Sequence, residues 1–331
     1  MLLDVADLRT HFLTPAGAVP AVAGVSFSVA KGRTLALVGE SGCGKTVTVL
    51  SLLRLLPEQR VQVGGRALFA GRDLLKLSPR EMRSIRGNRI AMVFQEPMSS
   101  LNPVLTVGEQ TAEPLRIHRR VSQRAARQRV VELFGLAGLP QPERCLDLYP
   151  HELSGGMRQR VMIAMALACE PELLIADEPT TALDVTIQAQ ILSLLRELRQ
   201  RTGMAMIFIT HDLAVVADIA DEVCVMYGGR VVERAPVADL FEAPRHPYTR
   251  GLLRCTPRLE NGSPDMRRRP LPVISGEVPD PGRLPAGCAF HPRCELGADD
   301  ARCQTQTPQL LNIAESRACA CWKAERGRVA Q

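Results

Sequence analysis

The sequence lacks the features that would carry the chain into or across a membrane. Its first residues, MLLDVADLRTHF, contain none of the basic region, long apolar core and small-residue cleavage site of a secretory signal. No uncharged apolar run reaches about 18 residues, the length expected of a membrane-spanning helix. We therefore expect a cytoplasmic chain. Its 331 residues, 46% of them hydrophobic, suffice for one large domain and a smaller one.

Lysine is scarce as well, since the chain has only four lysines and arginine supplies most of the positive charge. The net charge is +6, but 41 basic residues are scattered among 35 acids, which indicates a solvated surface and not a nucleic-acid footprint. The densest basic run, Arg267 to Arg269, lies in a proline-rich stretch and is expected to be an exposed loop. Where a lysine does occur, a role that arginine could not fill is worth seeking.

Lys45 lies in such a setting. The segment RTLALVGESGCGKTVTVLSLLRLL predicts a strand over Leu35 to Val38, a glycine-rich loop, and a helix from about Lys45 to Leu56. Glycines let backbone N–H groups curl around phosphate oxygens, and a slim ammonium reaches phosphates where a planar guanidinium fits less well. The Thr46 hydroxyl suits Mg²⁺. The predicted phosphate-binding residues are Gly39, Ser41, Gly42, Cys43, Gly44, Lys45 and Thr46, of which Cys43 is a space-filler.

A second segment, ELLIADEPTTALD, indicates hydrolysis. Leu173 to Ala176 form a predicted buried strand, and Asp177 and Glu178 stand at its carboxyl end, where doubly wound sheets place active groups. Asp177 can hold Mg²⁺ through water, and Glu178 can polarise the water that attacks a γ-phosphate. The alternative for Glu178 is a capping or salt-bridged surface acid.

A third segment, LSGGMRQRVMIAMALA, predicts a second helix N-terminus able to bind phosphate, at Ser154, Gly155 and Gly156. One nucleotide needs only one such site. The economical interpretation is a head-to-tail dimer, in which this segment closes over ATP held by the phosphate loop of the other subunit.

With these motifs in this order, the chain resembles the nucleotide-binding subunit of an ATP-binding cassette (ABC) transporter over roughly residues 1 to 255. Gln95 in MVFQEP matches the Q-loop, Asp184 in TALD the D-loop, and His211 in IFITHDLAVV the switch histidine. The resemblance implies that Gln95 senses Mg²⁺ and the lytic water, and that His211 binds the γ-phosphate. It also implies an aromatic residue stacked on adenine before the loop, for which Phe12 is the candidate.

The resemblance implies an α/β fold, a P-loop ABC ATPase core at residues 1–255 with an antiparallel β portion and a helical subdomain at about 97–170. In the strand VSFSV, alternation turns Val25, Phe27 and Val29 inward. In the helical subdomain, SQRAARQRVVELFGLAGL carries an apolar helical stripe. Residues 256–331 form a C-terminal cysteine-rich module, entered through a stretch rich in proline and glycine.

The segments EPMSSLNPVLTVGEQ and RHPYTRGLL resemble the oligopeptide/dipeptide branch of the importers, which also serves nickel and antimicrobial peptides. That branch implies a second ABC ATPase subunit, identical or paralogous, two membrane permease subunits, an extracytoplasmic solute-binding protein, and a peripheral place on the cytoplasmic face of the cell membrane. The rival is a soluble ABC protein acting on DNA or ribosomes. The chain has a single cassette and no sustained heptads, which favours the importer, and we expect no nucleic-acid partner. A third alternative is an inactive cassette, and the presence of Glu178 and His211 argues against it.

The tail holds half of the ten cysteines, which in a reducing compartment indicates a metal site more than a disulfide framework. Cys288, Cys294, Cys303 and Cys321 are separated by five, eight and seventeen residues, long for a zinc ribbon and better suited to a [4Fe–4S] cluster. The resemblance to importer tails with C-x-F-x-P-R-C makes Cys321 the last ligand and Cys319 an extra thiol. Zn²⁺ and unliganded thiols are the alternatives. We expect a structural role for the metal, whose loss should destabilise the tail and leave nucleotide binding intact.

Overall fold

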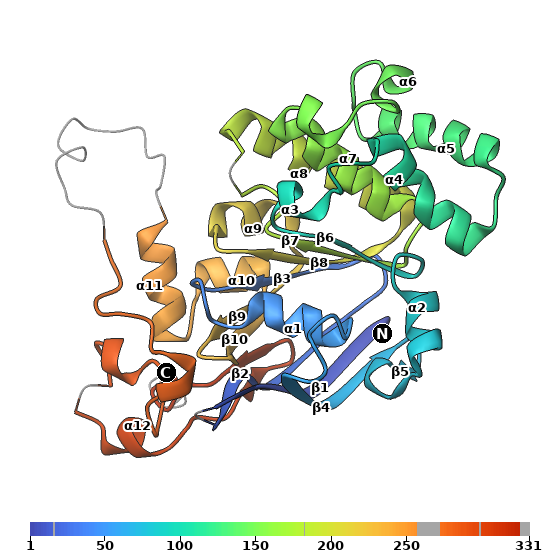
Figure 1. Ribbon diagram of the computed structural model, residues 1–331. Coiled ribbons are helices and arrows are strands. Elements are labelled where there is room, and N and C mark those ends of the chain that lie inside the picture. Colours follow the sequence, from blue (N-terminus) through green and yellow to red (C-terminus); the bar gives the residue numbers. More distant parts are fainter. Residues whose placement is uncertain (16, 182, 257–271, 298, 325–331) are drawn as a thin grey trace, which may run out of the picture. The chain divides into compact units, whose positions relative to one another are not determined.

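The computed structural model describes residues 1–15, 17–181, 183–256, 272–297 and 299–324 (Figure 1). The chain forms two compact units of mixed strands and helices. The first unit consists of residues 1–2, 29–34 and 69–209, and the second of residues 3–28, 35–68 and 210–331. The basic run Arg267 to Arg269 lies outside the described residues. So does most of the predicted linker, and the predicted boundary at residue 255 stays a prediction.

The centre of the first unit is a parallel sheet of strands β6 (Ile90–Val93), β7 (Leu173–Asp177) and β8 (Ala205–Thr210). β7 lies between the other two, with Ile175 paired to Met92 on one side and to Ile207 on the other. Every residue of β7 and β8 is buried. Continuous runs of Leu, Ile and Ala suit a strand covered on both faces, as a parallel sheet requires.

The helices of the first unit include three that pack together, α4 (Val107–Pro114), α5 (Gln123–Leu136) and α7 (Gly155–Leu167). The predicted stripe of α5 is confirmed, because Ala126, Val130, Leu133 and Phe134 are all buried. The remaining described elements of this unit are β5 (Arg72–Asp73), η1 (Leu74–Lys76), α2 (Pro79–Ile85), α3 (Pro97–Ser100), η2 (Leu115–Arg119), α6 (Pro142–Cys145), η3 (Pro150–Glu152) and α8 (Val185–Thr202).

The second unit contains a mixed set of strands, in which β3 (Thr34–Val38) pairs in parallel with β9 (Glu222–Tyr227). β9 continues through antiparallel pairings to β10 (Arg230–Pro236), β12 (Arg317–Cys319) and β11 (Leu311–Ala314). A separate sheet holds the hairpin of β1 (Leu3–Thr14) and β2 (Gly17–Val29), with β4 (Val61–Phe69) beside β1. The inward positions predicted for β2, Val25, Phe27 and Val29, are buried as expected.

Helix α1 (Lys45–Leu52) is four residues shorter than the predicted Lys45–Leu56. Arg54 adopts a left-handed φ of 49°, and the N–H of Leu55 donates to the carbonyl of Leu50 at 2.9 Å. The N–H of Arg54 donates to Ser51, which completes a Schellman motif that ends the helix. Apolar periodicity continued beyond this point, so the turn could not be detected from the pattern.

The C-terminal segment, residues 272–297 and 299–324, belongs to the core of the second unit. Its Phe290 is 4% exposed and packs against Tyr227 of β9 and Tyr248 of α11 (Pro247–Cys255). Strand β12 extends the sheet by pairing Cys319 with Glu233 of β10. The other elements described in this unit are α9 (Leu213–Ile219), α10 (Val237–Glu242), η5 (Pro281–Arg283), η6 (His291–Arg293) and α12 (Ala301–Thr305). Among the helices that the structure describes, none is both long and apolar enough to cross a membrane.

Candidate functional site

The glycine-rich loop connects β3 to α1, and its glycines are required by the backbone. Gly39 has a φ of 152°, and a Cβ there would collide with the carbonyl oxygen of Met226. Gly44 has a φ of 101°, and its Cβ would lie 2.5 Å from the carbonyl oxygen of Ala21. Gly44 also precedes α1, and no side chain caps that helix. A helix N-terminus without a side-chain cap favours a ligand that carries negative charge.

Lys45 lies in this loop with a side chain directed back across it. The residue is 5% exposed, and its Nζ donates to the carbonyl oxygens of Gly39 at 2.7 Å and Glu40 at 3.0 Å. Cys43 fills the space beneath, since it is buried and its Sγ lies 3.8 Å from Nζ. Burial raises the pKa of the Cys43 thiol, which keeps it neutral. Ser41 and Gly42 are exposed at the rim, and Thr46 is half-buried in the first turn of α1.

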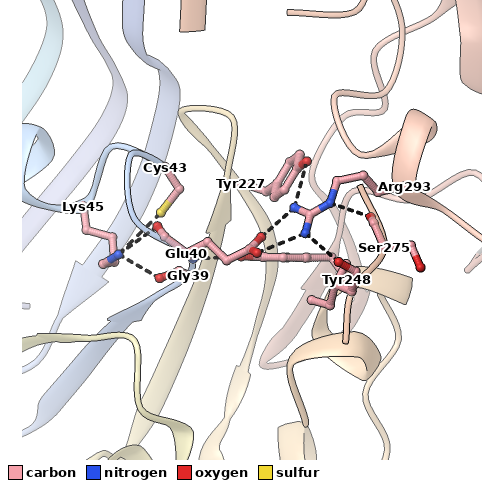
Figure 2. Close-up of polar contacts among 9 residues, drawn as sticks. Gly39, Glu40, Cys43, Lys45, Tyr227, Tyr248, Ser275 and Arg293 are labelled. Atoms are coloured by element: carbon pink, nitrogen blue, oxygen red, sulfur yellow. Dashed lines mark hydrogen bonds and ion pairs between the residues drawn. The ribbon is translucent and has the colours of Figure 1, made fainter. Parts of the chain in front are cut away.

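Sequence reasoning missed two residues, Arg293 and Tyr248, that contact the glycine-rich loop at Glu40. The Glu40 carboxylate forms an ion pair with Arg293, and the Glu40 N–H donates to the Tyr248 hydroxyl (Figure 2). The one signal in the sequence is an acid within the glycine-rich loop, and it does not say which distant residue pairs with that acid. The tail therefore contacts this loop directly, and the expectation that loss of the tail metal leaves nucleotide binding intact stays a prediction.

Glu178 of the first unit comes directly after β7, in a conformation that costs a side-chain-bearing residue energy. Its φ is 46°, a left-handed value that typically costs about 1–3 kcal/mol. Its N–H donates to Ile209 at 3.0 Å, and its Oε2 accepts from Gln95 Nε2 at 3.1 Å and Thr181 Oγ1 at 2.9 Å. Asp177, the last residue of β7, is 2% exposed. The structure thus brings Gln95 and Glu178 together, as their predicted roles require.

Ser154 caps helix α7 by accepting a hydrogen bond from the N–H of Met157 at 3.3 Å. Gly156 lies against α8, where a Cβ would be 3.0 Å from Ile187. Asp184 caps α8 by accepting from the N–H of Ile187 at 2.9 Å. The predicted signature and D-loop residues therefore lie side by side on the first unit, and Ser154, Gly155 and Asp184 are exposed.

Two further predicted residues belong to the second unit. His211 follows β8 directly and is exposed, while its neighbour Asp212 caps α9 by accepting from Ala214 at 2.8 Å. Phe12 lies half-buried near the end of β1. Strand β1 continues past Phe12 to Thr14, so Phe12 belongs to a regular strand. Stacking of Phe12 on adenine stays a prediction.

The four predicted metal-binding cysteines line one small pocket, together with Gly297. A Cβ on Gly297 would lie 3.5 Å from the sulfurs of both Cys294 and Cys303, and the N–H of Cys288 donates to Cys303 at 2.8 Å. Cys319 does not line this pocket and is buried in β12. Within the described part of the chain, no group of three or more His, Cys, Asp or Glu side chains is arranged to hold a metal ion.

Comparison with known proteins fits these motifs. The chain is 54% identical over 325 residues to "Probable peptide ABC transporter ATP-binding protein y4tR" of Sinorhizobium fredii, which covers 98% of this chain and 95% of that protein. The chain belongs to the ABC transporter family. The family model described as ABC transporter matches residues 22–181 of this ABC chain, and the model of the oligopeptide/dipeptide transporter C-terminal region matches residues 232–303.

Another relative of this ABC chain is "Dipeptide transport ATP-binding protein DppD" of Bacillus subtilis, 50% identical over 97% of this chain and 94% of that one. Among solved structures, an ATP-binding cassette dimer in a post-hydrolysis state with ADP and Pi is 27% identical, with a TM-score of 0.64 over 71% of this chain and 98% of that one. The ABC protein cbiO1 of Clostridium perfringens is 28% identical, with a TM-score of 0.61 over 73% and 91%. The fold is that of an ABC ATPase cassette.

Proposed function

We propose that this chain is the ATP-hydrolysing subunit of an importer of di- and oligopeptides, bound at the cytoplasmic face of the cell membrane. The observation that carries the proposal is the similarity to relatives named for peptide transport along the whole chain, tail included. Those names favour peptides over the two alternatives left by the sequence, nickel import and action on nucleic acid or ribosomes.

In this proposal each motif has a separate task. The loop from Gly39 to Thr46 binds the phosphates of ATP through backbone N–H groups and the Lys45 ammonium. Thr46, Gln95 and Asp177 supply the oxygen atoms suited to Mg²⁺, which neutralises phosphate charge when bound. Glu178 takes the proton of the attacking water, and the Gln95 amide that donates to its carboxylate orients it. His211 binds the γ-phosphate.

The proposed assembly is a pair of ABC subunits on two membrane permease subunits, supplied by an extracytoplasmic solute-binding protein. Ser154, Gly155, Gly156 and Asp184 are exposed or half-exposed, as residues that meet a second subunit must be. Exposed apolar side chains follow Gln95 in the sequence, with Val104 75% and Ile117 62% exposed. Apolar side chains of this kind suit contact with a membrane subunit.

Reconstitution with the membrane subunits and solute-binding protein tests the transport proposal. We expect di- and oligopeptides to raise the rate of ATP hydrolysis several-fold, because the solute promotes closure of the ATPase pair. Nickel, free amino acids and single-stranded nucleic acid, each at matched concentration, are the comparison solutes. Stimulation by nickel alone, or nucleic-acid binding with a steep salt dependence, would replace peptide import by one of the alternatives.

We also propose that Cys288, Cys294, Cys303 and Cys321 hold a metal centre, a [4Fe–4S] cluster in preference to Zn²⁺. The lining of one pocket by these four thiols, and not by Cys319, supports the assignment. Burial raises the pKa of the Cys288 thiol to about 11, so metal binding there would release a proton. A bound metal would staple a segment too short to bury a core of its own.

Paired serine substitutions test the cysteine assignment. Protein purified without oxygen is expected to be brown, with close to four irons and four sulfides per chain, and Cys321→Ser should lose the colour. Cys319→Ser is the matched control two residues away and should keep it, because Cys319 lies in β12, outside the pocket. Stoichiometric zinc without iron would favour Zn²⁺ as the bound metal. Protein that contains neither metal would favour unliganded thiols.

A further inference from the structure

Glu40 places a carboxylate in a loop that is otherwise built to attract phosphate. Its neighbours are Gly39, with a backbone shaped for close approach, and Lys45, with an ammonium across the loop. Like charges repel more strongly near the protein interior than in water, so an uncompensated Glu40 would oppose the binding of a triphosphate. Its charge and its position therefore both matter to the loop.

Arg293 of the C-terminal segment compensates this charge (Figure 2). Its Nη1 lies 2.7 Å from Glu40 Oε2 and its Nη2 lies 3.0 Å from Oε1, a two-pronged ion pair. The Arg293 side chain is 4% exposed and that of Glu40 is 29% exposed. A pair this sheltered from water is weakened little by salt, and its geometry is fixed.

The other N–H groups of Arg293 fix the guanidinium itself. Nε donates to the carbonyl of Ser275 at 3.0 Å, Nη2 to the carbonyl of Ile274 at 3.2 Å, and Nη1 to the Tyr227 hydroxyl at 3.4 Å. With the two bonds to Glu40, all five N–H groups of the guanidinium have acceptors. The ion pair with Glu40 raises the pKa of Arg293, so the side chain stays charged. Arg293 is a rigid support for the loop.

The backbone of Glu40 is held as firmly as its side chain. Its N–H donates to the Tyr248 hydroxyl at 2.9 Å, and its carbonyl accepts from Lys45 at 3.0 Å. Tyr248 is fully buried and packs edge-on against Tyr227, with 4.7 Å between ring centroids. Tyr248 belongs to RHPYTRGLL, a segment that the sequence marked only by its resemblance to the peptide branch.

The start of helix α11 is fixed in turn by a buried acid. The Glu233 carboxylate, 1% exposed, accepts from the N–H groups of Arg245 at 2.7 Å and His246 at 2.8 Å. His246 Nδ1 accepts from the N–H of Tyr248 at 3.1 Å, and burial lowers the pKa of His246 to about 3, so this nitrogen stays unprotonated. Tyr248 is therefore placed by β10 and cannot shift without breaking these bonds.

We propose that Arg293 and Tyr248 are positioning residues for the phosphate loop, and that through Glu40 the C-terminal segment sets the affinity of this subunit for ATP. This inference rests on the proposed assignment of residues 39–46 to ATP binding. Arg293 acts by cancelling the Glu40 charge and by holding the carboxylate away from the phosphates. Tyr248 acts by fixing the peptide N–H at the turn of the loop.

Equilibrium binding of Mg-ATP to the full chain tests the proposal. Arg293→Met should raise the dissociation constant at least about tenfold, since it leaves the carboxylate uncompensated. Turnover at saturating ATP should change less than about twofold, because Arg293 acts on binding and not on the attacking water. The double substitution Arg293→Met with Glu40→Gln should restore affinity to within about threefold of the unaltered protein, because it removes the repelling charge.

Arg254→Met is the matched control. This substitution breaks an ion pair between α11 and the same C-terminal segment, in which Arg254 lies 3.4 Å from Glu295. Both side chains of the pair are exposed, and the pair does not include Glu40. We expect its affinity for Mg-ATP to be unchanged. If Arg293→Met does not fold, Tyr248→Phe removes a single hydroxyl and should weaken Mg-ATP binding about threefold or more.

Several outcomes would overturn the inference. Binding of Mg-ATP by Arg293→Met within twofold of the unaltered protein would do so, as would a double substitution with no recovery of affinity. A purely structural role predicts the latter, because Glu40→Gln cannot mend lost packing. Lys45→Ala distinguishes failure of the positioning role from failure of the ATP site. If both Lys45→Ala and Arg293→Met bind Mg-ATP normally, the assignment of the loop to ATP fails. If Lys45→Ala loses binding and Arg293→Met does not, only the positioning role fails.

Discussion

Replacing Glu178 by glutamine is expected to lower ATP turnover at least about 10²-fold while leaving ATP binding intact, because it removes a general base and keeps the shape of the side chain. The glutamine oxygen can still accept from Gln95 and Thr181, which now contact Oε2 of Glu178. Phosphate release and nucleotide binding, measured on the same preparation, distinguish the two effects.

The control for this substitution is Glu172→Gln, at the other end of β7. Glu172 lies just before β7 and forms a half-exposed ion pair with Arg89 at 2.5 Å, and no catalytic role is proposed for it. It should leave turnover within about twofold, because a pair this exposed contributes about 0–1 kcal/mol. If Glu178→Gln hydrolysed ATP at a near-normal rate, another residue would have to be the base.

Substitution of Ser154 by arginine is expected to abolish ATP-driven pairing of subunits while leaving nucleotide binding by each subunit intact. Ser154 is an exposed residue at the N-terminus of α7, in the place proposed to face the γ-phosphate on the other subunit. A long cation there would occupy the space of that phosphate. Light scattering with ATP, on subunits that also carry Glu178→Gln, would measure pairing without loss of nucleotide.

Ser122→Arg is a close control for the loss of a helix cap. Ser122 caps α5 as Ser154 caps α7, each accepting from a backbone N–H at 3.3 Å, and both serines are exposed. Loss of either cap should cost about 1 kcal/mol of stability. Only Ser154→Arg should prevent pairing, and equal pairing by both variants would contradict the head-to-tail arrangement.

The parts of the structure that repeat a local pattern were predictable from the sequence. Buried strands such as β7, the apolar stripe of α5 and the loop between β3 and α1 each follow from a few adjacent residues. The end of α1 was not, because Arg54 adopts a conformation usually taken by glycine.

The contacts that hold the phosphate loop were beyond sequence reasoning for a different reason. Arg293 and Tyr248 contact Glu40 because the chain packs Phe290 against Tyr227 in the folded unit. No periodic pattern in the sequence encodes a pairing between such distant positions. The resemblance identified RHPYTRGLL but gave it no physical task. The structure supplies one, the contact of Tyr248 with Glu40.

The pairing of Glu40 with Arg293 has a consequence for the newly made chain. The two residues lie 253 positions apart, so at about 5–20 residues per second the ribosome makes the loop about 10–50 s before its arginine. During that interval every motif up to His211 emerges from the ribosome, yet the loop still carries an unpaired carboxylate. If Arg293 sets the affinity for ATP as proposed, a chain broken off before Arg293 would bind ATP more weakly than a finished chain.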